Sequence, residues 1–171
     1  MIPSKIDLNW KGPDSLTNLR RNPKTLTPGV YAIVRVVSGR ASLMYIGISE
    51  GIRKRLIDHR RGGVTIKNDG PSTLIYYAPV APFTDSWDDY WDFMEDVESM
   101  LIYTAEPKIN DEKKYRFKPR RPNDNLTIVN KNCDMPGIRQ TIVKKDVLKD
   151  SIEHKRERPK EREKTSLPFG L

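Results

Sequence analysis

Hydrophobic residues along this chain follow two different periods. Three short runs rich in β-branched and aromatic residues predict strands over 29–37, 42–48 and 72–80. The first two runs are joined near Gly39, which predicts a hairpin. A short helix is expected over 51–61, because Gly62 and Gly63 form a good C-terminal stop directly after it.

A long amphipathic helix is expected from about Thr84 to just before Pro107, with Thr84, Asp85 and Ser86 as candidate N-caps. Its apolar positions recur at three- and four-residue spacing: Trp87, Tyr90, Trp91, Met94, Val97, Leu101 and Ile102. Beyond Asn110 the pattern weakens, and it suggests a strand over 125–130 and a helix over 140–157. The order β-β-α-β-α predicts an α+β fold, with a small antiparallel or mixed sheet of about three strands flanked by helices.

The length of 171 residues fits one domain with tails. Prolines punctuate residues 1–27, which we expect to form an N-terminal arm with at most short structure. A folded core is expected over 28–111, and 112–152 should form an extension that packs on it or on a binding partner. Residues 153–171 are of mixed charge with little to bury, so they are expected to be a flexible tail.

Composition excludes several classes of protein. No apolar run is long enough to span a bilayer, and the mean hydropathy is −0.68, so we expect no membrane partner. The first residues lack the apolar stretch of a signal peptide, which makes the cytoplasm the expected compartment. The single cysteine, Cys133, excludes an internal disulfide and a multi-cysteine zinc site.

The net charge of +8 favours a polyanionic partner. It is unevenly placed: residues 85–98 hold seven acidic side chains and no basic one, whereas basic residues cluster over 52–61, over 113–121 and beyond Lys144. This asymmetry predicts one basic face and one acidic face. A solvated charged tail is the alternative for 153–171.

The turn of the predicted hairpin decides how two tyrosines lie relative to each other. If Val37, Ser38 and Gly39 form a three-residue loop, Tyr31 pairs directly with Tyr45 and shares its face of the sheet. A loop one residue longer would place them on opposite faces. A packed aromatic pair in the core is the structural alternative.

Arg55 and His59 are four residues apart and should project from one face of the short helix. An arginine can bind a phosphate through two parallel hydrogen bonds, and a histidine can donate a hydrogen bond to an oxygen or transfer a proton. The alternative is a basic helix whose charged side chains are simply solvated. Glu98 lies at the edge of the apolar stripe of the long helix, where a divalent metal would compensate its burial. A partly exposed Glu–Arg pair is the alternative there.

A set of motifs follows in order along about residues 28–111: Gly29-Val30-Tyr31, Tyr45-Ile46-Gly47, Arg55, His59, Glu98 and the run Pro107 to Asn110. Together they resemble the GIY-YIG nuclease domain. The first motif reads Gly-Val-Tyr here, and the connection between the motifs is somewhat long. The resemblance implies a metal-dependent phosphodiesterase that leaves 5′-phosphate and 3′-hydroxyl ends. It implies that Glu98 binds one Mg²⁺, with Mn²⁺ as a substitute, and that no organic cofactor is needed.

The resemblance also implies roles for the other residues. Tyr31 would be the general base, Arg55 would hold the phosphate, Tyr45 and His59 would position water or phosphate and tune Tyr31, and Asn110 would order the site. Double-stranded DNA is the expected substrate of a restriction-like or stand-alone enzyme, with a homodimer if both strands are cut. The candidate DNA contacts are Arg53, Lys54, Arg60, Arg61, Lys113, Lys114, Arg116, Lys118, Arg120 and Arg121. The alternatives are a nuclease for branched, single-stranded or RNA substrates, and a nucleic-acid-binding module without catalysis.

Overall fold

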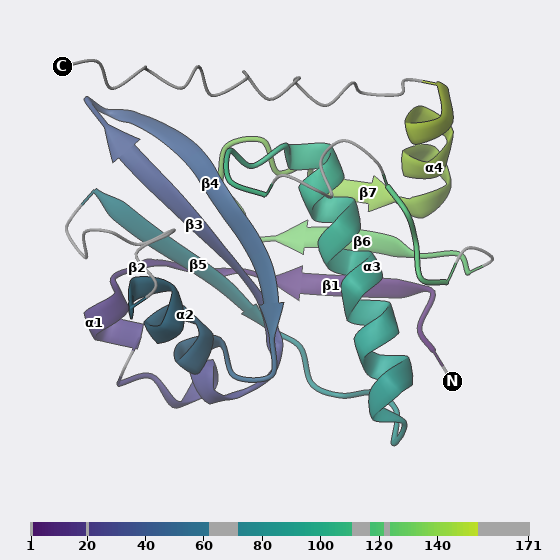
Figure 1. Cartoon of the computed structure of the whole chain (residues 1–171), viewed down its shortest axis with the longest axis horizontal. Coiled ribbons are helices and arrows are strands. Elements are labelled where there is room, and N and C mark those ends of the chain that lie inside the picture. Colours follow the sequence, from purple (N-terminus) through teal and green to yellow (C-terminus); the bar gives the residue numbers. More distant parts are fainter. Residues whose placement is uncertain (1, 20, 62–71, 111–116, 122–123, 154–171) are drawn as a thin grey trace, which may run out of the picture.

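A computed structural model of the chain describes residues 2–19, 21–61, 72–110, 117–121 and 124–153. Within them the protein has a small α+β fold with two sheets flanked by helices (Figure 1). The larger sheet has the order β2-β5-β3-β4, formed by β2 (Lys11–Asp14), β5 (Thr73–Pro79), β3 (Gly29–Val37) and β4 (Arg40–Ser49). All its strand pairs are antiparallel. The three predicted strands are therefore confirmed, and β2 adds a fourth.

The second sheet has the order β1-β6-β7, and of its strands only β6 was predicted, as the strand expected over 125–130. It consists of β1 (Lys5–Asn9), β6 (Thr127–Lys131) and β7 (Thr141–Val143). β1 runs parallel to β6 although more than a hundred residues separate them. A pairing of this kind leaves little trace in local sequence, because the five-residue β1 depends on a partner at the other end of the chain.

The expected helices are present, but the one predicted over 140–157 begins later, because residues 141–143 form strand β7; its predicted last residues, 154–157, lie outside the described residues. α2 (Ile52–Arg61) follows the hairpin, α3 (Trp87–Ala105) follows β5, and α4 (Lys144–Glu153) follows β7. The hydroxyl of Ser86 caps α3 by accepting from the backbone N–H of Asp89. None of the helices described in these ranges is long and apolar enough to cross a membrane.

Residues 2–19 and 21–27 are not a detached arm. They contain β1, β2, a short helix α1 (Leu16–Leu19) and a 3₁₀ turn η1 (Pro23–Leu26). Leu8 and Trp10 are buried in the larger hydrophobic cluster, and the Trp10 indole N–H donates to Asn130 Oδ1 at 2.8 Å. The expectation of short elements is met. Pro13 lies on the edge strand β2 and Pro23 is the first residue of η1, where proline is tolerated, so these two prolines did not prevent packing.

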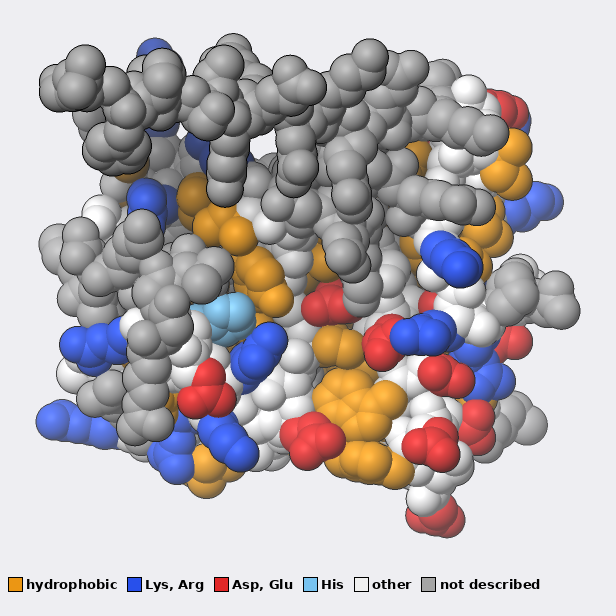
Figure 2. Space-filling view, in the orientation of Figure 1, with side chains coloured by type: hydrophobic (Ala, Val, Ile, Leu, Met, Phe, Trp, Pro, Cys, Tyr) orange, Lys and Arg blue, Asp and Glu red, His pale blue; other side chains and the backbone are white. Residues whose placement is uncertain are grey.

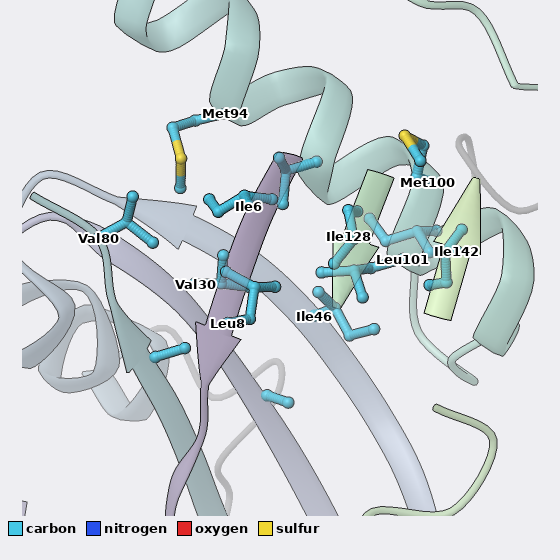
Figure 3. Close-up of a cluster of buried hydrophobic side chains, with 14 of the residues drawn as sticks. Ile6, Leu8, Val30, Ile46, Val80, Met94, Met100, Leu101, Ile128 and Ile142 are labelled. Atoms are coloured by element: carbon cyan, nitrogen blue, oxygen red, sulfur yellow. The ribbon is translucent and has the colours of Figure 1, made fainter. Parts of the chain in front are cut away.

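The sheet residues of β3 are buried on both faces. Val30, Ala32 and Val34 face the larger cluster, which β1, β6 and α3 complete (Figure 3). Tyr31 and Ile33 face a smaller cluster, which also contains Leu16 and Leu19 of α1 and Ile52 and Leu56 of α2. α3 thus packs on one side of the larger sheet and α1 and α2 on the other.

The described part of the C-terminal extension packs on the domain. Phe117, Leu126 and Val147 belong to the larger cluster. At the start of α4, Lys144 Nζ donates to Asp96 Oδ2 at 2.6 Å, and both side chains are only 2% exposed. Asp96 also accepts from the backbone N–H of Arg120 at 2.6 Å. A buried carboxylate on α3 therefore ties the extension to the domain.

Candidate active site

The hairpin differs from the predicted one in two ways. Its turn has two residues, Ser38 and Gly39, both with positive φ, and Val37 pairs with Arg40. A bulge then shifts the register, so that Ile33 pairs with Tyr45 but Val34 pairs with Leu43. The prediction that Tyr31 lies directly opposite Tyr45 is therefore wrong, because Tyr31 pairs with Gly47.

The prediction that Tyr31 and Tyr45 lie on the same face of the sheet is nevertheless confirmed. The two-residue turn alone would have put the tyrosines on opposite faces, and the extra residue in the bulge restores the parity. Tyr31 and Tyr45 are diagonal neighbours, with stacked rings whose centroids are 5.9 Å apart. Gly47 leaves the space for this arrangement, since a Cβ there would lie 2.6 Å from the Tyr31 hydroxyl and 2.8 Å from the Tyr45 ring.

His59 of α2 completes an aromatic cluster with the two tyrosines. The Tyr31 hydroxyl lies 2.7 Å from His59 Nε2, and the ring centroids of Tyr45 and His59 are 4.9 Å apart in an edge-on arrangement. Arg55, one turn earlier, lies close enough for its positive charge to act on the pKa of the Tyr31 phenol, which it lowers. The two tyrosines, Arg55 and His59 therefore form one cluster, called the α2 cluster below.

The position of α2 follows from its apolar side. Ile52 and Leu56 are fully buried against Leu16 and Leu19. This anchoring turns Arg55 and His59 toward the tyrosines, as the four-residue spacing predicts. Residues 16–19, which were expected to belong to an N-terminal arm, therefore support α2.

The electrostatics of the cluster favour neutral groups. Burial raises the pKa of the Tyr31 phenol, the neighbouring Tyr45 raises it further, and Arg55 opposes both. Burial also lowers the pKa of His59 below 6.5, and Arg55 adds to that shift, while Asp58 acts in the opposite direction. At neutral pH a phenol therefore faces an uncharged imidazole, and the 2.7 Å contact can be a hydrogen bond from Tyr31 to His59 Nε2.

Asn110 and Glu98 lie along the outer edge of β4. Asn110 accepts from the Ile46 N–H at 2.9 Å through Oδ1 and donates to the Ile46 carbonyl at 2.8 Å through Nδ2. Two residues further along the strand, Glu98 Oε1 accepts from the Ile48 N–H at 3.2 Å. These contacts hold the Tyr45-Ile46-Gly47 strand from the side opposite to β3, so an ordering role for Asn110 agrees with its geometry.

Glu98 is a fitting but minimal metal ligand. Mg²⁺ commonly takes only one or two carboxylates from a protein and completes its octahedron with waters and substrate phosphate. Glu98 is half-buried at the strand edge that carries Tyr45 and Gly47, which suits such a site. In the part of the chain that the structure describes, no group of three or more His, Cys, Asp or Glu side chains could hold a metal by itself.

The candidate DNA contacts separate into two sets. On α2, Lys54 and Arg60 are exposed and Arg53 is half-buried, and in the C-terminal extension Lys118 is exposed. Arg120 and Arg121 instead face the acidic side of α3: Arg120 Nε lies 2.6 Å from Glu95, and Arg121 Nη1 lies 2.9 Å from Asp89. These two guanidinium groups are thus engaged with the domain. The side chain of Arg61, residues Lys113, Lys114 and Arg116, and the tail from residue 154 lie outside the described residues.

Two supporting residues were not found from sequence. Tyr77 of β5 lies directly opposite Tyr31, and its hydroxyl accepts from Asn22 Nδ2 at 2.6 Å. Tyr77 was visible only as an apolar strand residue, and its pairing with Tyr31 depends on the register between β3 and β5. Asn22 carried no signal, because its contact spans 55 residues.

Comparisons of the chain with protein-family models, with curated proteins and with solved structures gave no match. The case for a function therefore depends on the motif set and on the geometry of the site.

Proposed function

We propose that the protein is a metal-dependent endonuclease of the GIY-YIG type that hydrolyses phosphodiester bonds in DNA. The observation that carries the proposal is the contact of the Tyr31 hydroxyl with His59 Nε2 at 2.7 Å, beside Arg55. A base, its proton acceptor and a phosphate-binding cation are thereby brought together from a strand and a helix. Glu98 lies on the neighbouring edge of the same hairpin.

The contact supplies a path for the proton of the attacking water. Tyr31 passes its phenolic proton to His59 Nε2 and takes a proton from the water, so that hydroxide attacks phosphorus and His59 becomes an imidazolium. The lowered pKa of His59 keeps it unprotonated and ready to accept at neutral pH. The raised pKa of Tyr31 means that the phenol gives up its proton only in concert with this transfer.

Arg55 would couple substrate binding to this proton path. Tyr31 is fully buried, whereas Arg55 is exposed and lies close enough for its charge to lower the pKa of the Tyr31 phenol. A phosphate that binds the guanidinium would draw it outward and open the phenol to water. The same guanidinium then stabilises the negative charge that develops on the phosphate oxygens.

A Mg²⁺ ion held by Glu98 would supply Lewis-acid stabilisation of the phosphate and of the leaving 3′ oxygen. Glu98 would contribute its carboxylate to that ion while Ile48 N–H fixes its orientation. The expected products are 5′-phosphate and 3′-hydroxyl ends. A restriction-like enzyme that cuts both strands would need a second copy of the chain, since one chain carries one such site.

The test is to incubate the protein with Mg²⁺ and plasmid, branched, single-stranded and RNA substrates, and to sequence the ends. We expect cleavage that Glu98→Ala removes while DNA binding is retained. Asp92→Ala is the matched control, because Asp92 is an exposed carboxylate on the same helix. Wild-type cleavage in excess chelator would exclude the metal role. Binding without cleavage under every condition would indicate a nucleic-acid-binding module instead.

A further inference from the structure

An aromatic ledge lies on the N-terminal half of α3, and it consists of Trp87 and Trp91. The Trp87 ring stacks on the buried Tyr90 ring at a centroid distance of 5.3 Å and an angle of 15°. Trp91 contacts Trp87 edge-on at 5.8 Å. One face of Trp87 is thus covered by Tyr90, and the side chain remains 45% exposed, so the ledge presents a flat ring to solvent.

The ledge lies on the same side of α3 as Glu98. Trp87, Trp91 and Glu98 are at positions i, i+4 and i+11, which return to within about 40° of one direction around a helix. Trp87 is separated from Glu98 by roughly 16 Å along the axis. At the B-form spacing of about 3.4 Å per nucleotide, this corresponds to a few nucleotides of a strand.

Charge divides the surroundings of the ledge. Asp88, Asp92 and Glu95 lie about 80–140° further round α3, where they would repel phosphates. Lys and Arg side chains gather over α2, and hydrophobic side chains gather over the N-terminal half of α3 among the acidic ones (Figure 2). A strand whose phosphates follow α2 would therefore turn its bases toward α3.

We propose that the ledge stacks an unpaired nucleobase of the substrate, a few nucleotides from the phosphate that is cut. This inference depends on the proposed nuclease function and narrows its substrate class to DNA with an unpaired segment. A ring with one open face binds any base, because every base has a π-face. A fully paired duplex offers no such face away from its ends, and its second backbone would approach the carboxylates of α3.

The experiment measures binding by fluorescence anisotropy of labelled DNA in chelator, where no cleavage occurs. The probes are a single strand of about 12 nucleotides, a duplex with an internal unpaired loop, and the fully paired duplex. Trp87→Ala is expected to raise Kd for the first two probes about tenfold and for the paired duplex less than twofold. If Trp87→Ala weakens binding of the single strand alone, the stacked base belongs to a free single strand. If it weakens binding of both the single strand and the looped duplex, the ledge stacks unpaired bases in either kind of DNA.

Three variants keep the test specific. Trp87→Tyr should retain most of the affinity because it keeps an aromatic face, whereas Trp87→Leu should lose it although it still covers Tyr90. Leu26→Ala removes a hydrophobic side chain that is 54% exposed and lies on η1, away from α3, and it should leave every Kd unchanged. An unchanged Kd for every probe, or an equal loss on the paired duplex, would overturn the proposal. If Trp87→Ala weakens binding but no substrate is ever cleaved, the proposed nuclease function is wrong and the base-stacking role of the ledge is retained. If cleavage depends on Glu98 but Trp87→Ala changes no Kd, the nuclease function is retained and the base-stacking role is wrong.

Discussion

The protein contains two clusters of polar and ionisable side chains that differ in how they are satisfied. Asp96 and Lys144 are almost completely buried, and each is bonded to the other and to backbone groups of residues 120–121. In the cluster at α2, Tyr31 is buried, but His59 and Tyr45 are half-buried and Arg55 is exposed. The first cluster is closed to ligands, and the second has an outer side that a ligand can reach.

The difference shows how a structural ion pair can be told from a candidate site. A buried pair persists only when all its hydrogen bonds are made, and removing one partner leaves an unpaired charge. The α2 cluster instead places a phenol against an imidazole, and both have pKa values shifted by burial and by Arg55. Shifted pKa values beside an accessible cation are typical of a reactive site. The predictions below test this contrast from the largest effect to the smallest.

Tyr31→Phe should reduce kcat about 10²- to 10⁴-fold, because in the proposed mechanism the phenolic oxygen exchanges protons with water and with His59. The free energy of unfolding should fall by only about 1 kcal/mol, the value of one hydrogen bond. Single-turnover cleavage and chemical denaturation measure the two quantities. Near-normal turnover would mean that another group is the base.

Asp96→Ala should lower the free energy of unfolding by about 3–5 kcal/mol, because Lys144 is left buried and unpaired. The kcat of the folded fraction should change less than twofold, because Asp96 does not contact the α2 cluster in the described structure. The double variant Asp96→Leu/Lys144→Met is the control and should recover much of the stability. A loss of kcat in fully folded Asp96→Ala would contradict the separation of the two clusters.

Gly47→Ala should destabilise the protein by about 1–3 kcal/mol and also reduce cleavage. The added Cβ would lie within 3 Å of both Tyr31 and Tyr45, so the stacked pair must move. Gly51→Ala is the matched control: its Cβ would come no closer than 3.8 Å to any neighbouring atom, and it should be neutral. Equal behaviour of the two variants would show that the tyrosine geometry is not constrained by Gly47.

The register at Gly47 also shows what sequence could and could not predict. Strand and helix positions followed from hydrophobic period, and α3 was well defined because its apolar stripe and the Ser86 cap agree. The pairing of Tyr31 with Gly47 was missed because the turn has two residues and a bulge adds one more residue to β4. Each feature shifts the strand register by one residue, and neither has a strong signal in the local sequence. The packing of residues 5–19 was missed because β1 pairs with β6 at the far end of the chain.

The candidate site was more predictable than the supports around it. Arg55 and His59 could be grouped from their spacing along one helix, the resemblance to the nuclease family added Tyr31, and the structure brings the three together. Asn22, Tyr77 and Asp96 act through contacts with residues distant in sequence. Asp96 looked like one more acid on the polar side of α3, yet it is buried because the segment around Arg120 and the start of α4 cover it.

The smallest predicted effect concerns the acid limb of the pH–rate profile. In the proposed mechanism His59 must be unprotonated to accept the proton of Tyr31, so kcat/KM should rise with pH through the lowered pKa of His59, at a midpoint below 6.5. Asp58 raises the pKa of His59, in opposition to burial and to Arg55. Asp58→Asn should therefore move the midpoint to still lower pH, and the variant should keep more of its activity under acidic conditions. Glu50→Gln removes another negative charge just before α2 and serves as the control for general effects on DNA binding. A midpoint that Asp58→Asn leaves in place or raises would show that the limb reports a group other than His59.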